Sequence, residues 1–172
     1  MTLVILGGLP GSGKSQLARS IGIALGCAVL SVDTIEIGMR RANVGRDQPI
    51  GLAAYTVAQA IADEELSLRH SILVDAVNSA PAAREAWQML ARDHETSLLV
   101  IEVECNDRDV HRKRVEGRRG KVPQVTWQQV CAQRDEYLPW DIKTLRVDSS
   151  DGDMGRMLRE VLAAIELARL VD

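Results

Sequence analysis

A stretch of eight residues near the amino terminus has the residue types and the spacing of a phosphate-binding loop. It reads GLPGSGKS and fits the pattern Gly-x-x-x-x-Gly-Lys-Ser. Glycines in such a loop let the backbone turn tightly and direct its N–H groups inward around a polyphosphate. The lysine then reaches the β- and γ-phosphates, and the serine hydroxyl is placed to bind Mg²⁺. We predict that ATP and Mg²⁺ bind here, with nucleotide contacts from Gly8, Leu9, Pro10, Gly11, Ser12, Gly13, Lys14 and Ser15.

Two aspartates follow apolar segments that are typical of strands. Asp33 stands in SVDTIE, and Asp75 ends SILVD. The carboxyl ends of neighbouring parallel strands meet at one edge of a sheet, where nucleotide sites lie. We predict Asp33 as the catalytic base that accepts the proton of an acceptor hydroxyl, and Asp75 as a magnesium ligand beside Ser15. Two structural roles remain open, because Asp33-x-x-Glu36 also fits a helix-capping box and Asp75 also fits the start of a turn.

The run DRDVHRKRVEGRRGK, from Asp107 to Lys121, concentrates basic charge in an acidic protein. It holds seven basic and three acidic residues, so it carries +4, whereas the whole chain has a formal charge of −3. A helix here would place the positive charges of Arg114 and Arg118 side by side. The repulsion between two like charges at this spacing costs about 0.2–0.5 kcal/mol, and a bound polyphosphate would relieve it. We predict a phosphate lid over about residues 107–122. A solvated helix face and a nucleic-acid-binding surface are the alternatives.

Short apolar segments alternate with helical patterns along the chain. This alternation is typical of a parallel sheet with helices on both faces, so the predicted fold class is α/β. No repeat or linker divides the chain, and we predict a single domain over residues 1–172. The expected strands are 2–6, 27–32, 71–75, 97–105 and 144–148. The expected helices are 14–25, 33–40, 52–69, 81–94, 126–137 and 154–170, with Asn78 or Ser79 as the cap of the helix at 81–94.

The composition narrows the class of protein. Aromatic residues make up 3% of the chain, which leaves little material for a platform that stacks nucleic-acid bases. Basic charge is local, whereas general polyanion binders tend to be basic across a whole face. No apolar stretch reaches membrane length, and the three cysteines are scattered as in reduced, cytosolic proteins. We therefore expect a cytoplasmic protein with neither a membrane nor a nucleic acid as its partner.

Five segments, taken in order, resemble the AAA-type P-loop kinase family in its zeta-toxin and polynucleotide-kinase-like group: GLPGSGKS, SVDTIE, VDAVN, RVEGR and YLPWD. The resemblance implies a nucleoside-kinase-like, three-layer fold with a five-stranded parallel sheet in the order 2-3-1-4-5. It also implies ATP with Mg²⁺, an aspartate at Asp33 and a small lid after the fourth strand. The spacing Arg114-x-x-x-Arg118 matches the arginines of that lid, with Arg119 as an alternative to either. Shikimate kinases are more distant, since their Gly-Gly-Gly segment is missing here.

These residues predict an ATP-dependent kinase, which transfers the γ-phosphoryl group to a hydroxyl of a small molecule or nucleotide. The predicted catalytic residues are Asp33, Lys14, Arg114 and Arg118. The N-K-x-D motif of GTPases and the L-S-G-G-Q signature of transporter ATPases are absent. Two alternatives stay open: a polynucleotide 5′-hydroxyl kinase, and a sensor that binds ATP without transferring a phosphoryl group. The sequence names neither the acceptor nor the oligomeric state.

Overall fold

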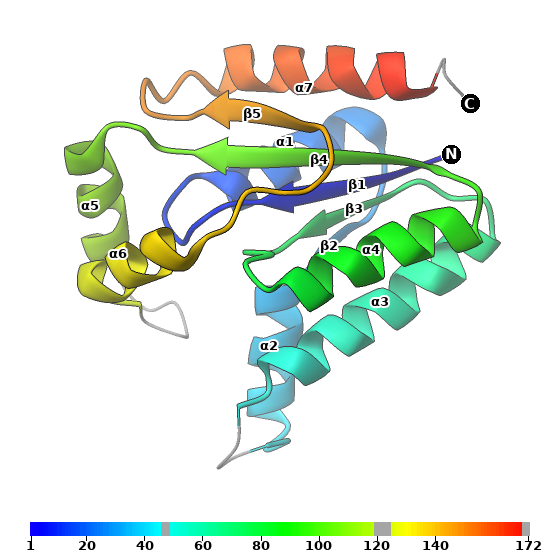
Figure 1. Ribbon diagram of the computed structural model, residues 1–172, viewed down its shortest axis with the longest axis horizontal. Coiled ribbons are helices and arrows are strands. Elements are labelled where there is room, and N and C mark those ends of the chain that lie inside the picture. The colour runs from blue at the N-terminus through cyan, green and yellow to red at the C-terminus, as the bar shows by residue number, and fades with distance from the viewer. Residues whose placement is uncertain (46–48, 119–124, 170–172) are drawn as a thin grey trace.

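The computed structural model describes residues 1–45, 49–118 and 125–169, and the structural statements below concern these residues. Strands and helices alternate along the chain, as the sequence predicts (Figure 1). The strands are β1 (Thr2–Gly7), β2 (Val29–Ser31), β3 (Ile72–Asp75), β4 (Ser97–Glu104) and β5 (Thr144–Asp148). The helices are α1 (Lys14–Leu25), α2 (Val32–Arg41), α3 (Gly51–Ser67), α4 (Pro81–Asp93), α5 (Arg108–Glu116), α6 (Trp127–Glu136) and α7 (Met154–Arg169).

The five strands form one sheet in the order β2-β3-β1-β4-β5, and every neighbouring pair is parallel. Both the α/β class and the predicted strand order are therefore confirmed. The register aligns the carboxyl ends of the strands: Leu6 of β1 lies opposite Asp75 of β3, and Ser31 of β2 lies on the other side of Asp75. Segments that leave β1, β2 and β3 consequently start from one edge of the sheet.

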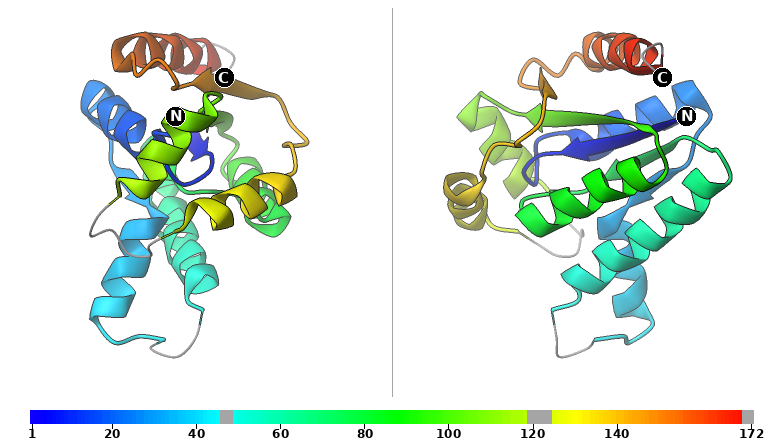
Figure 2. Two further views of the ribbon diagram at one scale, coloured as in Figure 1. Left: turned by 90° about the vertical axis from the view of Figure 1, so that its left-hand side faces the viewer. Right: turned by 45° about the vertical axis from the view of Figure 1, so that its right-hand side comes forward.

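Helices cover both faces of the sheet, which gives three layers (Figures 1 and 2). Helices α1 and α7 pack on one face through apolar residues that include Leu17, Ile21 and Val161. Helices α3 and α4 pack on the other face. Alanines recur every fourth residue along α3, and Trp87 of α4 fills the space beside them. The period of these residues matches a helix turned with one stripe toward a core.

Helices α5 and α6 lie beyond the carboxyl ends of the strands rather than over a face of the sheet (Figure 1). They border the segment that follows β1. In the part of the chain that the structure describes, no helix combines the length and the apolar character needed to cross a bilayer.

The structure corrects three local predictions. Strand β2 is shorter than expected, because residues 27 and 28 do not pair as strand. Helix α2 begins at Val32, and its cap is Ser31, whose hydroxyl accepts a hydrogen bond from the Thr34 N–H at 3.3 Å. The alternative role of Asp33, as the first residue of a capping box, is therefore wrong. Helix α4 begins after Ala80 without a side-chain cap, so neither Asn78 nor Ser79 has the predicted capping role.

Candidate active site

The GLPGSGKS segment forms a tight turn between β1 and α1. Its three glycines all have positive φ: 138° at Gly8, 84° at Gly11 and 93° at Gly13. The Ser12 N–H donates to the Leu9 carbonyl at 3.1 Å and closes the turn. At Gly8 a Cβ atom would lie 2.3 Å from the Val103 carbonyl oxygen, so only glycine fits. The loop therefore has the backbone freedom that a phosphate cradle needs, and the start of α1 adds the positive end of its dipole.

Four of the predicted site residues line a single cavity of about 280 Å³. They are Ser15 at the start of α1, Asp33 in the first turn of α2, Asp75 at the end of β3 and Arg118 just after α5. Arg19, one helical turn beyond Ser15, lines the same cavity and was not predicted. These residues are far apart in the sequence. They meet in one cavity because β1, β2 and β3 end at one edge of the sheet.

Asp75 is buried, and its Oδ1 atom has no hydrogen-bond partner among the described residues. Burial raises the pKa of this carboxyl, while the neighbouring Lys14 ammonium and Ser15 hydroxyl lower the pKa and so favour the charged form. A buried carboxylate with a free oxygen beside a serine hydroxyl is a set of hard oxygen ligands. These two residues therefore fit a bound Mg²⁺.

Asp33 is half-buried, and Ser31 rather than Asp33 caps the helix, so no capping bond holds the Asp33 carboxylate. Close to it lies Tyr55 of α3, whose hydroxyl accepts a hydrogen bond from the Asn78 N–H at 2.9 Å. Burial raises the pKa of Tyr55 to about 12, and the charge of Asp33 contributes to the increase. Sequence reasoning missed Tyr55, because it lies within a helical pattern that has no motif around it.

Helix α5 is bonded directly to the phosphate-binding loop. The imidazole Nε2–H of His111 donates to the Pro10 carbonyl at 2.8 Å, and its Nδ1 accepts from the Arg134 guanidinium of α6, also at 2.8 Å. The tautomer follows from the partners, since a carbonyl only accepts and a guanidinium only donates. The side chains of His111 and Val115 also lie against Gly11. Helix α5, which contains the described first part of the basic run, is therefore packed against the phosphate-binding loop.

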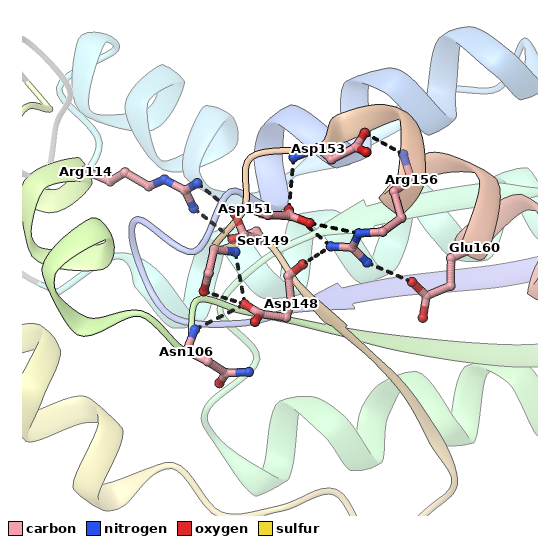
Figure 3. A network of polar contacts seen from close by, with 9 residues as sticks. Asn106, Arg114, Asp148, Ser149, Asp151, Asp153, Arg156 and Glu160 are labelled. Atoms are coloured by element: carbon pink, nitrogen blue, oxygen red, sulfur yellow. Dashed lines mark hydrogen bonds and ion pairs between the residues drawn. The ribbon is translucent and has the colours of Figure 1, made fainter.

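The guanidinium of Arg114 reaches the loop through a serine. It donates at 2.8 Å to both the hydroxyl and the carbonyl of Ser149 (Figure 3). The Ser149 hydroxyl in turn donates to the Ser12 carbonyl at 2.6 Å. Asp148 steadies this segment by accepting from the backbone N–H of Asn106 at 3.2 Å. Arg114 is thus held by the β5–α7 loop, whereas Arg118 lines the Asp33 cavity.

Part of the predicted lid falls outside the described residues. Arg119, the alternative nucleotide-binding arginine, belongs to that part. Gly117 follows the last residue of α5, and its N–H donates to the Lys113 carbonyl. Within α5, Arg112 pairs with Glu116 at a nitrogen–oxygen distance of 2.8 Å.

Comparisons with known proteins place the chain in a family. A family model described as an AAA domain matches residues 3–138, which is most of the chain. The chain belongs to this AAA domain family. The finer resemblance to zeta toxins and polynucleotide kinases stays a prediction. An uncharacterized protein of Mycobacterium tuberculosis, Rv2004c, and one of Mycobacterium bovis, Mb2027c, are each 28% identical over 151 residues. The match covers 81% of this chain and 30% of each relative, so this chain corresponds to less than a third of the length of these proteins.

Solved structures share the fold of this AAA domain. A gluconokinase from Sinorhizobium meliloti 1021 superposes with a TM-score of 0.69 at 20% identity and covers 99% of this chain and 95% of its own. The Mycobacterium tuberculosis APS kinase in complex with AMPPNP and APS gives 0.70 at 21% identity, with 96% and 97% covered. Chaetomium thermophilum Kti12 in complex with ADP-AlF3 gives 0.71 at 20% identity, with 96% and 98% covered. The fold is that of P-loop kinases.

One buried cation holds the YLPWD segment against α4 in this AAA domain. Arg84 of α4 lies between the rings of Tyr137 and Trp140, with its Cζ atom 4.8 Å from the centre of each. It also donates to the Asn78, Leu138 and Pro139 carbonyls at 2.7–2.9 Å. Nothing in the spacing around Arg84 indicates the contact with YLPWD, because Leu138 and Pro139 lie more than fifty residues away.

Proposed function

We propose that this AAA domain is an ATP- and Mg²⁺-dependent kinase, which transfers the γ-phosphoryl group to a hydroxyl of a small molecule or nucleotide. The observation that carries the proposal is the Asp33 cavity, where Ser15, Asp33, Asp75 and Arg118 converge beside the phosphate-binding loop. A phosphoryl-transfer site needs a metal position, a base and a cation at one point, and this cavity has residues suited to each. The solved relatives named as kinases share the fold and support the class.

In the proposed reaction, Lys14 and the loop amides hold the β- and γ-phosphates. Asp33 accepts the proton of the acceptor hydroxyl while that oxygen forms a bond to the γ-phosphorus. The bond from the γ-phosphorus to its bridging oxygen breaks, and the electron pair leaves with ADP. Arg118 faces the transferred group and neutralises its charge. Mg²⁺ held by Ser15 and Asp75 supplies charge neutralisation at the phosphates.

The two lid arginines take different parts in the proposal. Arg118 lines the cavity and acts on the phosphoryl group directly. Arg114 donates hydrogen bonds from both of its terminal nitrogens to Ser149, whose hydroxyl in turn donates to the Ser12 carbonyl. From this position Arg114 supports the phosphate-binding loop, and two of its five N–H groups are used by Ser149.

The test is transfer of labelled γ-phosphate from Mg·ATP into a pool of small metabolites, with a 5′-hydroxyl oligonucleotide assayed separately. Asp33→Asn is expected to lower transfer by about 10²–10⁴-fold, since it removes the base, and to leave ATP affinity close to that of the wild type. Glu36→Gln is the matched control, because Glu36 lies one turn further along α2 and pairs with Arg40 at 2.7 Å.

The outcomes separate the alternatives. A labelled small molecule that disappears with Asp33→Asn supports the kinase and identifies the acceptor. Labelling of the oligonucleotide alone would point to a polynucleotide 5′-hydroxyl kinase. Tight ATP binding with no labelled product in either assay would reject catalysis and favour the nucleotide sensor.

A further inference from the structure

A second cavity, of about 340 Å³, borders the other side of the phosphate-binding loop. Its walls are the loop itself, the end of β4 with the segment after it, and residues of helices α5 and α6. The lining residues that matter here are Ser12, Glu102, Glu104, Arg134 and Tyr137. This cavity shares no lining residue with the Asp33 cavity. Three residues of its lining, Gly8, Leu9 and Ser12, belong to the phosphate-binding loop. The residues proposed to act at the transfer step, Asp33, Asp75 and Arg118, do not line it.

The charge in this second cavity is unbalanced. Glu102 is a carboxylate with 5% of its side chain exposed, and Glu104 lies two residues further along β4. Arg134 is the cation of the lining, and its guanidinium already donates to His111. On the solvent side, Arg146 lies 3.4 Å from Glu102 and 3.9 Å from Glu104, but it is 59% exposed. Water screens ion pairs of that kind, so they contribute little.

Glu102 is also poorly hydrogen-bonded for a buried charge. Among the described residues, it accepts a long hydrogen bond of 3.4 Å from the Thr144 hydroxyl, beside the 3.4 Å ion pair with Arg146. Charge-assisted bonds to carboxylates are usually about 2.7–2.9 Å, and a buried carboxylate without such a partner is costly. Glu102 lies opposite Gly7 in the β1–β4 register, and the Tyr137 hydroxyl and the Trp140 indole nitrogen lie within 4 Å of where a Cβ of Gly7 would be. Glu102 also lines the cavity, so its carboxylate is open to a donor that enters there.

Two further polar side chains line the same space. The Ser12 side chain is 1% exposed, and its hydroxyl has no hydrogen-bond partner among the described residues. The Tyr137 hydroxyl, which lies 3.1 Å from where a Cβ of Gly7 would be, donates to the Val77 carbonyl at 3.3 Å, and its oxygen can still accept a hydrogen bond. Buried polar atoms without partners usually mark a water or ligand site.

We propose that this second cavity binds a small organic cation, whose ammonium group pairs with Glu102 and whose hydroxyl or amino groups meet Ser12 and Tyr137. The volume corresponds to about eleven water molecules at about 30 Å³ each, so it holds a molecule of up to about a dozen heavy atoms. The site is a binding site separate from the Asp33 cavity, and its test does not depend on phosphoryl transfer.

The experiment compares amines with alcohols of matched shape. Binding to the purified full chain is measured by titration calorimetry with ethanolamine, 1,4-diaminobutane and glucosamine, each beside ethylene glycol, 1,4-butanediol and glucose. At least one amine is expected to bind about 10- to 100-fold more tightly than its alcohol, the difference that one charge-assisted hydrogen bond makes. Glu102→Gln keeps the shape of the side chain and is expected to abolish the preference.

The controls make the result decisive. Glu166→Gln removes an exposed carboxylate of α7 and is expected to leave the preference unchanged. Thermal unfolding shows whether Glu102→Gln folds; if it does not, Glu104→Gln at the rim is expected to weaken amine binding instead. The proposal is overturned if no amine binds the wild type more tightly than its alcohol. It is equally overturned if a folded Glu102→Gln variant keeps the preference.

Discussion

Acidification is predicted to destabilise the protein through His111, the residue that joins α5 to the phosphate-binding loop. His111 is 1% exposed, and both of its ring nitrogens are committed. Protonation would put a hydrogen on Nδ1, which faces the Arg134 guanidinium and would lose its role as an acceptor. Burial lowers the pKa of His111, the hydrogen bond to Pro10 opposes this effect, and the charges of Arg134, Arg114 and Lys14 lower the pKa further.

The sign and size of the effect follow from this lowered pKa. In the unfolded chain histidine has a pKa of about 6.5. Well above that pH both states are neutral, and the full stability is present. As the pH falls below about 6.5, the unfolded chain takes up a proton that the folded chain resists. The free energy of unfolding then falls by up to about 1.4 kcal/mol per pH unit, until the folded-state pKa is reached.

The measurement is urea unfolding between pH 8 and pH 5, for the wild type and His111→Gln. Glutamine places an amide N–H near the former Nε2–H, so it can still donate to Pro10, but it does not titrate. Its free energy of unfolding is expected to depend less on pH, by up to one proton. His70→Gln is the control, since His70 is exposed on the surface and its ring is hydrogen-bonded to the Glu65 carboxylate at 2.9 Å.

The predicted role of His111 is wrong if the wild type and His111→Gln lose stability in parallel as the pH falls below about 6.5. It is also wrong if His70→Gln removes as much of the pH dependence as His111→Gln. Either result would mean that the contact between α5 and the loop does not control the acid response.

Three other substitutions test the phosphate-binding loop, the buried Arg84 of α4 and the proposed metal ligand. Gly11→Ala is expected to lower the free energy of unfolding by about 1–3 kcal/mol in urea, because its Cβ would lie 2.6 Å from Val115 at a φ of 84°. Arg84→Lys is expected to cost about 2–4 kcal/mol by the same assay, since lysine lacks the planar fork that bonds several carbonyls between two rings; stability equal to the wild type would contradict this. Asp75→Asn is expected to weaken Mg·ATP binding about tenfold or more in calorimetry while leaving metal-free ATP binding unchanged; equal loss with and without Mg²⁺ would argue against a metal role.

Features that depend on neighbours along the chain could be predicted from the sequence. The spacing of Gly8, Gly13 and Lys14 identified the phosphate-binding loop, and apolar segments of strand length located five strands in the right order along the chain. Caps were less predictable. Ser31 and Asp33 both have side chains that can cap a helix, and the choice between them depends on where β2 stops pairing with β3.

Contacts across long separations were decided only by the tertiary structure. His111 bonds Pro10 across 101 residues, and Arg84 bonds Pro139 across 55. Neither partner can be found from local spacing, because the pairing depends on which strands are neighbours in the sheet and on which helices rest against its edge. The same holds for the second cavity. Glu102 lies opposite Gly7 only because β4 pairs with β1, and its burial in the sheet leaves it with Arg146, which is mostly exposed, as its ion-pair partner.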